Sequence, residues 1–178
     1  LARATGRRAQ VDRLMKSTPY PSLILSAVDG ALVPEAQRAD NISETQLFAP
    51  LYPFALGAGE YGCFQSHRVA WQKIVDKGLD AALILEDDVA LTDGFDAALT
   101  LASDHVEAFG YIQFQVRSID ESRVMAQAGG VSIVQPRVTP LRTSAQLVSR
   151  IAAQSLLDMT SQIDRPVDTF LQSHWHTG

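Results

Sequence analysis

Three consecutive acids, Glu86, Asp87 and Asp88, follow directly on the apolar run 81–85. Close carboxylates repel one another, and burying one without a partner costs several kcal/mol. A positive charge should therefore lie beside them at least part of the time. In an extended segment Glu86 and Asp88 point to one side and Asp87 to the other. Two carboxylates on one side suit a hard divalent cation, Mg²⁺ or Mn²⁺, which often shares its shell with water and phosphates.

The spacing of the three acids leaves other readings open. A solvated acidic turn after a strand needs no ligand, and a two-metal phosphatase or nuclease would use the same three acids. A metal-dependent phosphohydrolase would need further acids or histidines around a second ion. His105, His174 and His176 are few for that purpose, and they are not spaced as such a site.

Alternating helices and strands are expected to position the acids. The predicted helices cover 7–16, 60–77, 95–109 and a segment capped by Ser149 that runs to Met159; the predicted strands cover 22–30, 79–89, 111–116 and 143–149. Residues 131–140 are extended and ambiguous. This order predicts an α/β sandwich with a mostly parallel sheet. Ligands of such sheets bind outside the carboxyl ends of the strands, where the acids would lie.

Composition and charge limit the class of protein. The 178 residues suffice for one domain with one core, and 46% hydrophobic with 20% charged residues is ordinary for a globular protein. A net charge of −5 argues against a nucleic-acid surface. The single Cys63 cannot form an internal disulfide, and no apolar run reaches membrane-spanning length, so we expect a cytoplasmic protein. The basic residues between Ala2 and Lys16 form either a solvated helix face or a contact to phosphate or an anionic membrane.

The stretch 59–89 resembles the signature of glycosyltransferase family 25, the lipopolysaccharide-biosynthesis and collagen-galactosyltransferase group. Its members carry a Gly-Glu-x-Gly-Cys-x-x-Ser-His stretch, a Trp one helical turn later, and a strand ending in Leu-Glu-Asp-Asp. The matching residues here are Gly59, Glu60, Gly62, Cys63, Ser66, His67, Trp71, Leu85, Glu86, Asp87 and Asp88. The stretches "SAVDG" (26–30), "TSAQLVSRIAAQSLL" (143–157) and "PVD" (166–168) are similar to three further stretches of the family, so the likeness covers most of the chain from about Arg7.

The resemblance implies a GT-A type fold, a Rossmann-like α/β sandwich that uses a nucleotide sugar, commonly UDP-galactose. Residues 1–178 would then be a single glycosyltransferase domain that begins after the family's first strand. That late start keeps a non-catalytic nucleotide-sugar-binding domain open as an alternative. The expected acceptor is an oligosaccharide or lipid-linked glycan such as a lipopolysaccharide core, reached by peripheral contact with the inner face of the membrane. Gln146 stands where the family usually has an aromatic residue in "Ala-Tyr", which leaves the acceptor specificity open.

In this family the Glu-Asp-Asp plays the part of a metal-binding Asp-x-Asp motif, with Mn²⁺ or Mg²⁺ as cofactor. An ion bridging the two donor phosphates takes up the charge of the departing diphosphate and also compensates the acids. Asp88 and Glu86 are the expected metal ligands, although Asp88 could instead belong to a turn. Glu86 could also bind through water or contact the ribose. Asp87 either contacts the donor or faces away and structures the turn.

Further donor contacts are expected from Asp29, Glu60 and His67, and each has a plainer reading. Asp29 could simply form an Asp-Gly turn, and Glu60 could be a helix acid that favours the dipole. His67 lies on the apolar stripe of its helix, where a hydrogen-bonded core histidine is equally expected. Trp71 is expected in the core. Cys63 is expected to be a small buried hydrophobe rather than a nucleophile.

Members of this type invert the anomeric centre, as the resemblance implies, so a base must take the acceptor proton on the face opposite the leaving diphosphate. Asp168 is the candidate catalytic base. It follows Pro166 in an extended approach and could start a helix through Phe170. The plainer reading is that Asp168 only caps this helix, and Asp164 is the nearest rival for the role.

Overall fold

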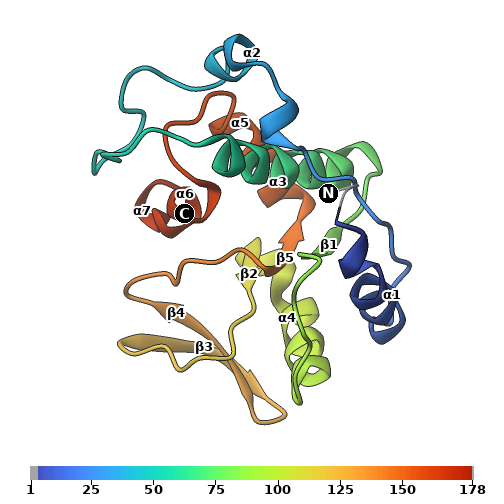
Figure 1. The fold of residues 1–178 in the computed structure, drawn as a ribbon. Helices are drawn as coiled ribbons and strands as arrows, with labels where there is room; N and C mark the ends of the chain where they lie inside the picture. Colours follow the sequence, from blue (N-terminus) through green and yellow to red (C-terminus); the bar gives the residue numbers. More distant parts are fainter. Residues whose placement is uncertain (1–3, 178) are drawn as a thin grey trace.

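The computed structural model describes residues 4–177 and shows a mixed α/β protein in which helices cover both faces of a small central sheet (Figure 1). The elements, in chain order, are η1 (Thr5–Arg7), α1 (Arg8–Ser17), η2 (Gly30–Leu32), α2 (Glu35–Ala39), α3 (Ala58–Asp76), β1 (Ala81–Leu85), α4 (Phe95–Phe109), β2 (Tyr111–Gln113), β3 (Ser122–Ala128), β4 (Val131–Pro136), β5 (Ala145–Ser149), α5 (Arg150–Met159), α6 (Val167–Gln172) and α7 (His174–Thr177). No helix within this part of the chain has both the length and the apolarity needed to cross a bilayer.

The half-buried β1 strand packs against apolar residues on both of its faces, which explains its unbroken apolar sequence. Ala82 and Ile84 pack toward the core formed with α3, α5 and α6, whereas Ala81 and Leu83 pack toward α4. Trp71 on α3 is fully buried in the first of these cores, as expected from the sequence. The sheet therefore forms the middle of three layers and fixes the end of β1 between them.

The expectation of a mostly parallel sheet is wrong for the described residues. The central sheet has the order β1-β5-β2, and β5 is antiparallel to both neighbours. The β1 and β2 strands do run in the same direction, joined through α4, but they do not bond to each other. The chain returns through the β3–β4 hairpin and inserts β5 between them. Such a strand insertion depends on long-range pairing, which local periodicity does not encode.

The strand expected over 22–30 is also absent, because this segment finds no partner edge among the described residues. It is instead fixed against α3, where the N–H of Val28 donates to Ser66 Oγ at 2.9 Å. Conversely, the structure contains a β3–β4 hairpin that the sequence does not predict. The β3 strand over Ser122–Ala128 is not expected, and the segment that contains β4 is ambiguous. Its turn is Gly129-Gly130, both with positive φ, a dipeptide that favours two-residue hairpin turns.

Gly30 and Gly62 allow the segment before η2 to approach the backbone of α3 directly. A Cβ added to Gly62 would lie 2.7 Å from both the N of Gly30 and the O of Val28. Gly59 lies on the same helix, and a Cβ there would meet nothing within 4 Å. The close approach holds the turn at Asp29 against the N-terminal half of α3.

We expect Gly62→Ala to destabilise the protein by about 1–3 kcal/mol, because fixed backbone atoms occupy the space of the new methyl group. Gly59→Ala should instead be neutral or stabilising by up to about 1 kcal/mol, since Ala is the better helix former. Urea unfolding of the two variants measures this difference. A Gly62→Ala variant as stable as Gly59→Ala would show that the two segments do not touch as described.

Candidate active site

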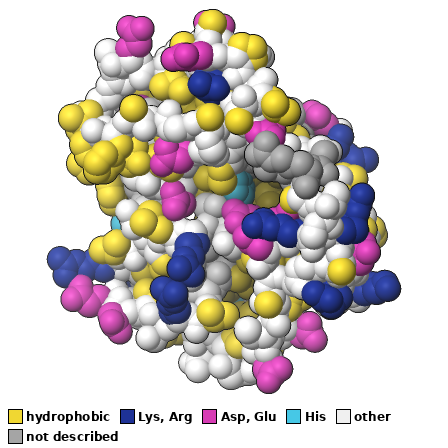
Figure 2. All heavy atoms as spheres, in the orientation of Figure 1, with side chains coloured by type: hydrophobic (Ala, Val, Ile, Leu, Met, Phe, Trp, Pro, Cys, Tyr) yellow, Lys and Arg dark blue, Asp and Glu magenta, His cyan; other side chains and the backbone are white. Residues whose placement is uncertain are grey.

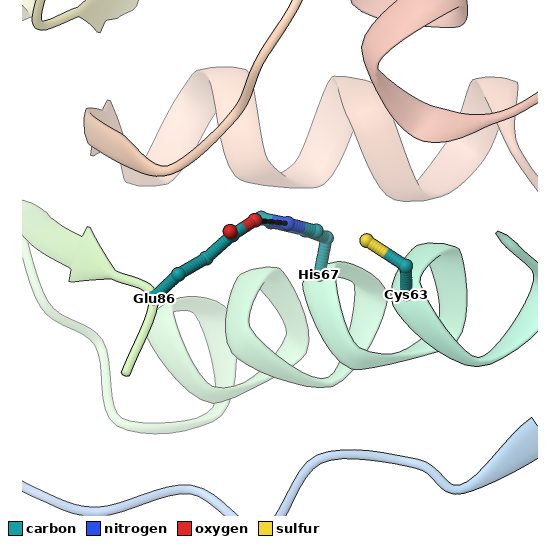
Figure 3. A group of neighbouring side chains, drawn as sticks. All are labelled: Cys63, His67 and Glu86. Carbon is teal, nitrogen blue, oxygen red and sulfur yellow. Dashed lines mark ion pairs between the residues drawn. The ribbon is translucent and has the colours of Figure 1, made fainter. Parts of the chain in front are cut away.

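The three acids separate at the end of β1. Pairing continues as far as the N–H of Glu86, which donates to the carbonyl of Ser144 at 2.8 Å, and a turn begins at Asp87. Glu86 points toward His67 on α3 (Figure 3), whereas Asp87 and Asp88 both face Arg7. The expected alternation, with Glu86 and Asp88 on one side, is therefore wrong, because the extended backbone stops before Asp87.

Arg7 supplies the positive charge beside the acids. Its guanidinium pairs with Asp87 and lies 3.3 Å from Asp88 Oδ2. The hydrogen bond and charge of Asp87, followed by the charge of Asp88, raise the pKa of Arg7. One turn along, Gln10 donates to the carbonyl of Val89 at 2.5 Å and holds α1 against the same loop. Part of the basic segment thus contacts the protein's own acids.

A buried polar network orients Glu86. Gln146 is fully buried, and its amide nitrogen donates to Thr143 O at 3.0 Å and to His67 Nδ1 at 3.1 Å. The His67 hydrogen is thereby assigned to Nε2, which lies 3.2 Å from Thr143 Oγ1 and 3.5 Å from Glu86 Oε1. His67 is 5% exposed, so it is a hydrogen-bonded core histidine that contacts a candidate ligand residue.

The same network lowers the pKa of Glu86. The hydrogen bond from His67 is the largest cause, burial opposes it, and hydrogen bonds from Thr143 and Ser144 add to the lowering. A carboxyl group with a lowered folded-state pKa stabilises the protein above its unfolded pKa, and this contribution is lost as the pH falls through the folded value.

We therefore expect Glu86→Gln to lower the melting temperature at pH 7, and the gap from wild type to close as the pH falls below about 4. Glu107→Gln, at an exposed position on α4, is the matched control and should show little change at either pH. Thermal melts between pH 3 and 7 measure both gaps. A Glu86→Gln gap that is independent of pH would contradict the network.

A cavity of about 440 Å³ opens where α3, the end of β1, the approach to β5 and the start of α6 meet. Its lining residues are Tyr52, Glu60, Cys63, Glu86, Arg142, Thr143, Ser144, Pro166, Val167, Asp168 and Thr169. Figure 2 shows a hollow on this face of the molecule with acidic side chains and a histidine around it. The structure thus brings together three of the predicted site residues, Glu60, Glu86 and Asp168, whereas Asp29, His67, Asp87 and Asp88 lie outside this lining.

Asp168 and its rival Asp164 occupy different environments. Asp168 is half-buried in the first turn of α6, but Pro166 is the N-cap, and within residues 4–177 the Asp168 carboxylate accepts a hydrogen bond only from the adjacent Thr169 N–H at 2.8 Å. Asp164 is bonded by Arg165 Nε and by the N–H of Leu47, both at 2.8 Å. Burial alone would raise the pKa of Asp164, but these hydrogen bonds lower it overall. The Asp164 carboxylate is thus hydrogen-bonded to Arg165 and Leu47, whereas Asp168 lines the cavity.

Glu60 and Asp29 both make local helix contacts. Glu60 accepts from the Gly57 N–H at 2.8 Å, a capping interaction at the start of α3, and it also borders the cavity. Asp29 is the N-cap of η2 and accepts from the Ala31 N–H at 3.3 Å. These contacts agree with Glu60 as an acid at the start of a helix and with Asp29 as part of a turn. Glu60 differs from Asp29 in that it also lines the cavity.

Cys63 was expected to be buried, but it is exposed. Desolvation, with the negative charges of Glu86 and Asp168, raises the pKa of its thiol to about 11. The thiol is protonated at neutral pH and is a poor nucleophile, as expected from the sequence.

Cys63, His67 and Glu86 form a group that could hold a metal ion. One ligand atom from each lies within 4.8 Å of the others (Figure 3). A mixed sulfur, nitrogen and oxygen set suits a softer ion than the aspartates do. Coordination through His67 Nε2 would move the ring hydrogen to Nδ1, and among the described residues the buried Gln146 Oε1 has no hydrogen-bond partner. Rotation of that amide would give Nδ1–H an acceptor but would break the bond from Gln146 Nε2 to Thr143 O. The fit to an ion therefore rests on the chemistry of the three donor atoms.

Several site residues could not be found from the sequence. Tyr52 and Arg142 come from loops that carry no motif, and only folding brings them to the cavity. Thr143 and Ser144 fall in the predicted strand 143–149 but precede β5, and nothing in the sequence marks them as cavity residues. The sequence marks Gln146 only because it replaces the aromatic residue usual in the resembled family. In the structure its buried side chain donates a hydrogen bond to His67 Nδ1. Arg7 carried one signal, its place in the basic segment.

Comparison with known proteins identifies the family. The family model "Glycosyltransferase family 25 (LPS biosynthesis protein)" matches residues 1–171. Procollagen galactosyltransferase 1 of Danio rerio is 29% identical over 96% of this chain and 30% of its own length. The lacto-N-neotetraose biosynthesis glycosyltransferase LgtB of Neisseria gonorrhoeae is 27% identical over 89% of this chain and 58% of its own length.

A further relative carries the name of an inactive protein. The human protein called inactive glycosyltransferase 25 family member 3 is 31% identical over 61% of this chain and 18% of its own length. The chain thus spans less than two thirds of the relatives it matches. Because the family model covers nearly all of the sequence, the chain belongs to glycosyltransferase family 25.

Proposed function

We propose that this chain is a single catalytic domain that transfers a sugar, galactose, from a UDP-sugar to a hydroxyl of a glycan acceptor with inversion at the anomeric carbon. The observation that carries the proposal is that Glu86, at the end of β1, and Asp168, at the start of α6, line one cavity in a member of this family. A GT-A type fold is part of the proposal. It is supported by the helices on both faces of the sheet and by the acids at the carboxyl end of β1.

The proposed cofactor is Mn²⁺ or Mg²⁺, held by Asp88 and Glu86. These two carboxylates face apart in this structure, so the turn at Asp87 and Asp88 would have to shift for both to reach one ion. When bound, the ion supplies Lewis-acid stabilisation of the diphosphate leaving group. Asp88 would exchange its contact with Arg7 for the ion, while His67 and Thr143 hold the carboxylate of Glu86 in place. The alternative donor set, Cys63, His67 and Glu86, favours a softer ion such as Zn²⁺.

The remaining proposed roles follow from position. Asp168 takes the proton of the acceptor hydroxyl, and Glu60 and Glu86 contact the donor from the wall of the cavity that they share with Asp168. Asp29, His67 and Asp87 complete the proposed donor site from outside that wall. The proposed acceptor is an oligosaccharide or lipid-linked glycan such as a lipopolysaccharide core, met in the cytoplasm at the membrane surface.

Two further functions remain to be separated by experiment. A non-catalytic nucleotide-sugar-binding domain is favoured by the relative named inactive, and a phosphohydrolase would use the same acids. The test measures UDP release from UDP-galactose and other UDP-sugars with Mn²⁺, Mg²⁺, Zn²⁺ or EDTA, with and without glycan acceptors. Release that requires both metal and acceptor supports transfer. A thermal shift without turnover indicates binding only, and phosphate release from nucleotides indicates hydrolysis; either outcome would overturn the proposal.

A further inference from the structure

The loop of residues 47–57, between α2 and α3, carries large apolar side chains at its tip. Leu51 is 64% exposed and Phe54 is 70% exposed. Figure 2 shows a cluster of hydrophobic side chains on the side of the molecule where Figure 1 places this loop. Exposed apolar surface of this kind commonly marks a binding site.

The loop is anchored at both of its ends. Arg165 donates to Phe48 O at 2.5 Å, and Trp175 donates to Ala49 O at 3.0 Å. At the other end the Gly57 N–H is bonded to Glu60. These contacts hold the base of the loop while its tip remains open to solvent, the arrangement expected of a binding loop on a fixed scaffold.

The tip is continuous with the cavity of the active site. The rings of Tyr52 and Phe54 pack edge to face with centroids 5.6 Å apart, and Tyr52 also lines the cavity with Glu60 and Asp168. Burial, followed by the charges of Glu60 and Asp168, raises the pKa of the Tyr52 phenol. An aromatic surface and two hydrogen-bond acceptors therefore border one opening.

We propose that Tyr52 and Phe54 form the platform on which a pyranose ring of the acceptor stacks before transfer. The C–H face of such a ring is apolar and gains free energy when it covers an aromatic ring. A hydroxyl at the ring edge can donate to Asp168, the candidate base, which lines the same cavity as Tyr52. Because this inference rests on the proposed function, its test must be able to fail independently of that function.

The test is direct sugar binding, with no donor or turnover required. Methyl β-D-galactopyranoside and methyl β-D-glucopyranoside are titrated into the 178-residue chain and followed by saturation-transfer NMR. We expect transfer to the ring C–H protons in wild type, and a Kd raised about tenfold in Phe54→Ala and in Tyr52→Ala, the scale of one lost aromatic stack. Tyr52→Phe should keep most of the affinity. Ile151→Ala removes an equally exposed apolar side chain from α5 and should change nothing.

Three results would overturn the platform. The first is the absence of glycoside binding, and the second is glycoside binding that both alanine variants retain. The third is Phe54-dependent binding of a procollagen peptide without glycoside binding, which would make the loop a peptide site. Melting temperatures of all variants exclude unfolding as the cause, and UDP-galactose binding by thermal shift reports the donor site separately. If the platform fails this test while UDP-galactose still binds, only the inference about the platform is overturned, and the proposed function is not.

Discussion

Asp168→Asn should keep UDP-galactose binding and the melting temperature near wild type while transfer falls by roughly 10²–10⁴, the usual contribution of a positioned general base. The amide keeps the shape of the side chain and can still accept from the Thr169 N–H, but it cannot take a proton. Steady-state transfer rates, together with thermal shifts induced by the donor, measure the two effects separately.

The structure makes this test sharper than the sequence did. A capping role would predict almost no effect, because Asn caps as well as Asp, and Asp168 is not the N-cap of α6. Asp164→Asn is the control for a structural aspartate. It breaks a pair with Arg165, which is 2% exposed, so it should cost about 3–5 kcal/mol of stability. Near-normal transfer by Asp168→Asn would end the proposal that it is the base.

Asp88→Asn should remove the metal dependence of UDP-sugar binding and lower transfer at least about a hundredfold, the scale of losing one preorganised electrostatic element. The fold should be little changed. The Asp88 pair with Arg7 is about half exposed, and such pairs contribute between 0 and about 1 kcal/mol. Donor affinity measured against Mn²⁺ concentration gives the result.

Asp87→Asn is the matched control, because it removes the same charge and the other contact to Arg7. We expect Asp87→Asn to leave the apparent Mn²⁺ affinity within a few fold of wild type. If Mn²⁺ dependence survives in Asp88→Asn and disappears in Cys63→Ser, the ion is held by the group of Cys63, His67 and Glu86 instead. Full activity of Asp88→Asn would remove Asp88 from the site.

The sequence determined those parts of the fold that rest on local periodicity and local chemistry. The apolar stripe of α3, the apolar β1 strand and the Ser149 cap of α5 were all predictable, and the structure confirms each of them. Gly78, which follows the predicted helix 60–77, has a φ of +61° after the Lys77 C-cap. The motif residues could be recognised as well, because they lie within one short stretch of the chain.

Only the tertiary structure decided strand direction and the surroundings of each acid. The insertion of β5 between β1 and β2 depends on which edges meet after the β3–β4 hairpin, and no local pattern specifies this choice. For the same reason Arg7 could not be placed beside Asp87 and Asp88, nor Gln146 behind His67. These contacts join residues far apart in the sequence, so their chemistry exists only once the helices and the sheet have packed around β1.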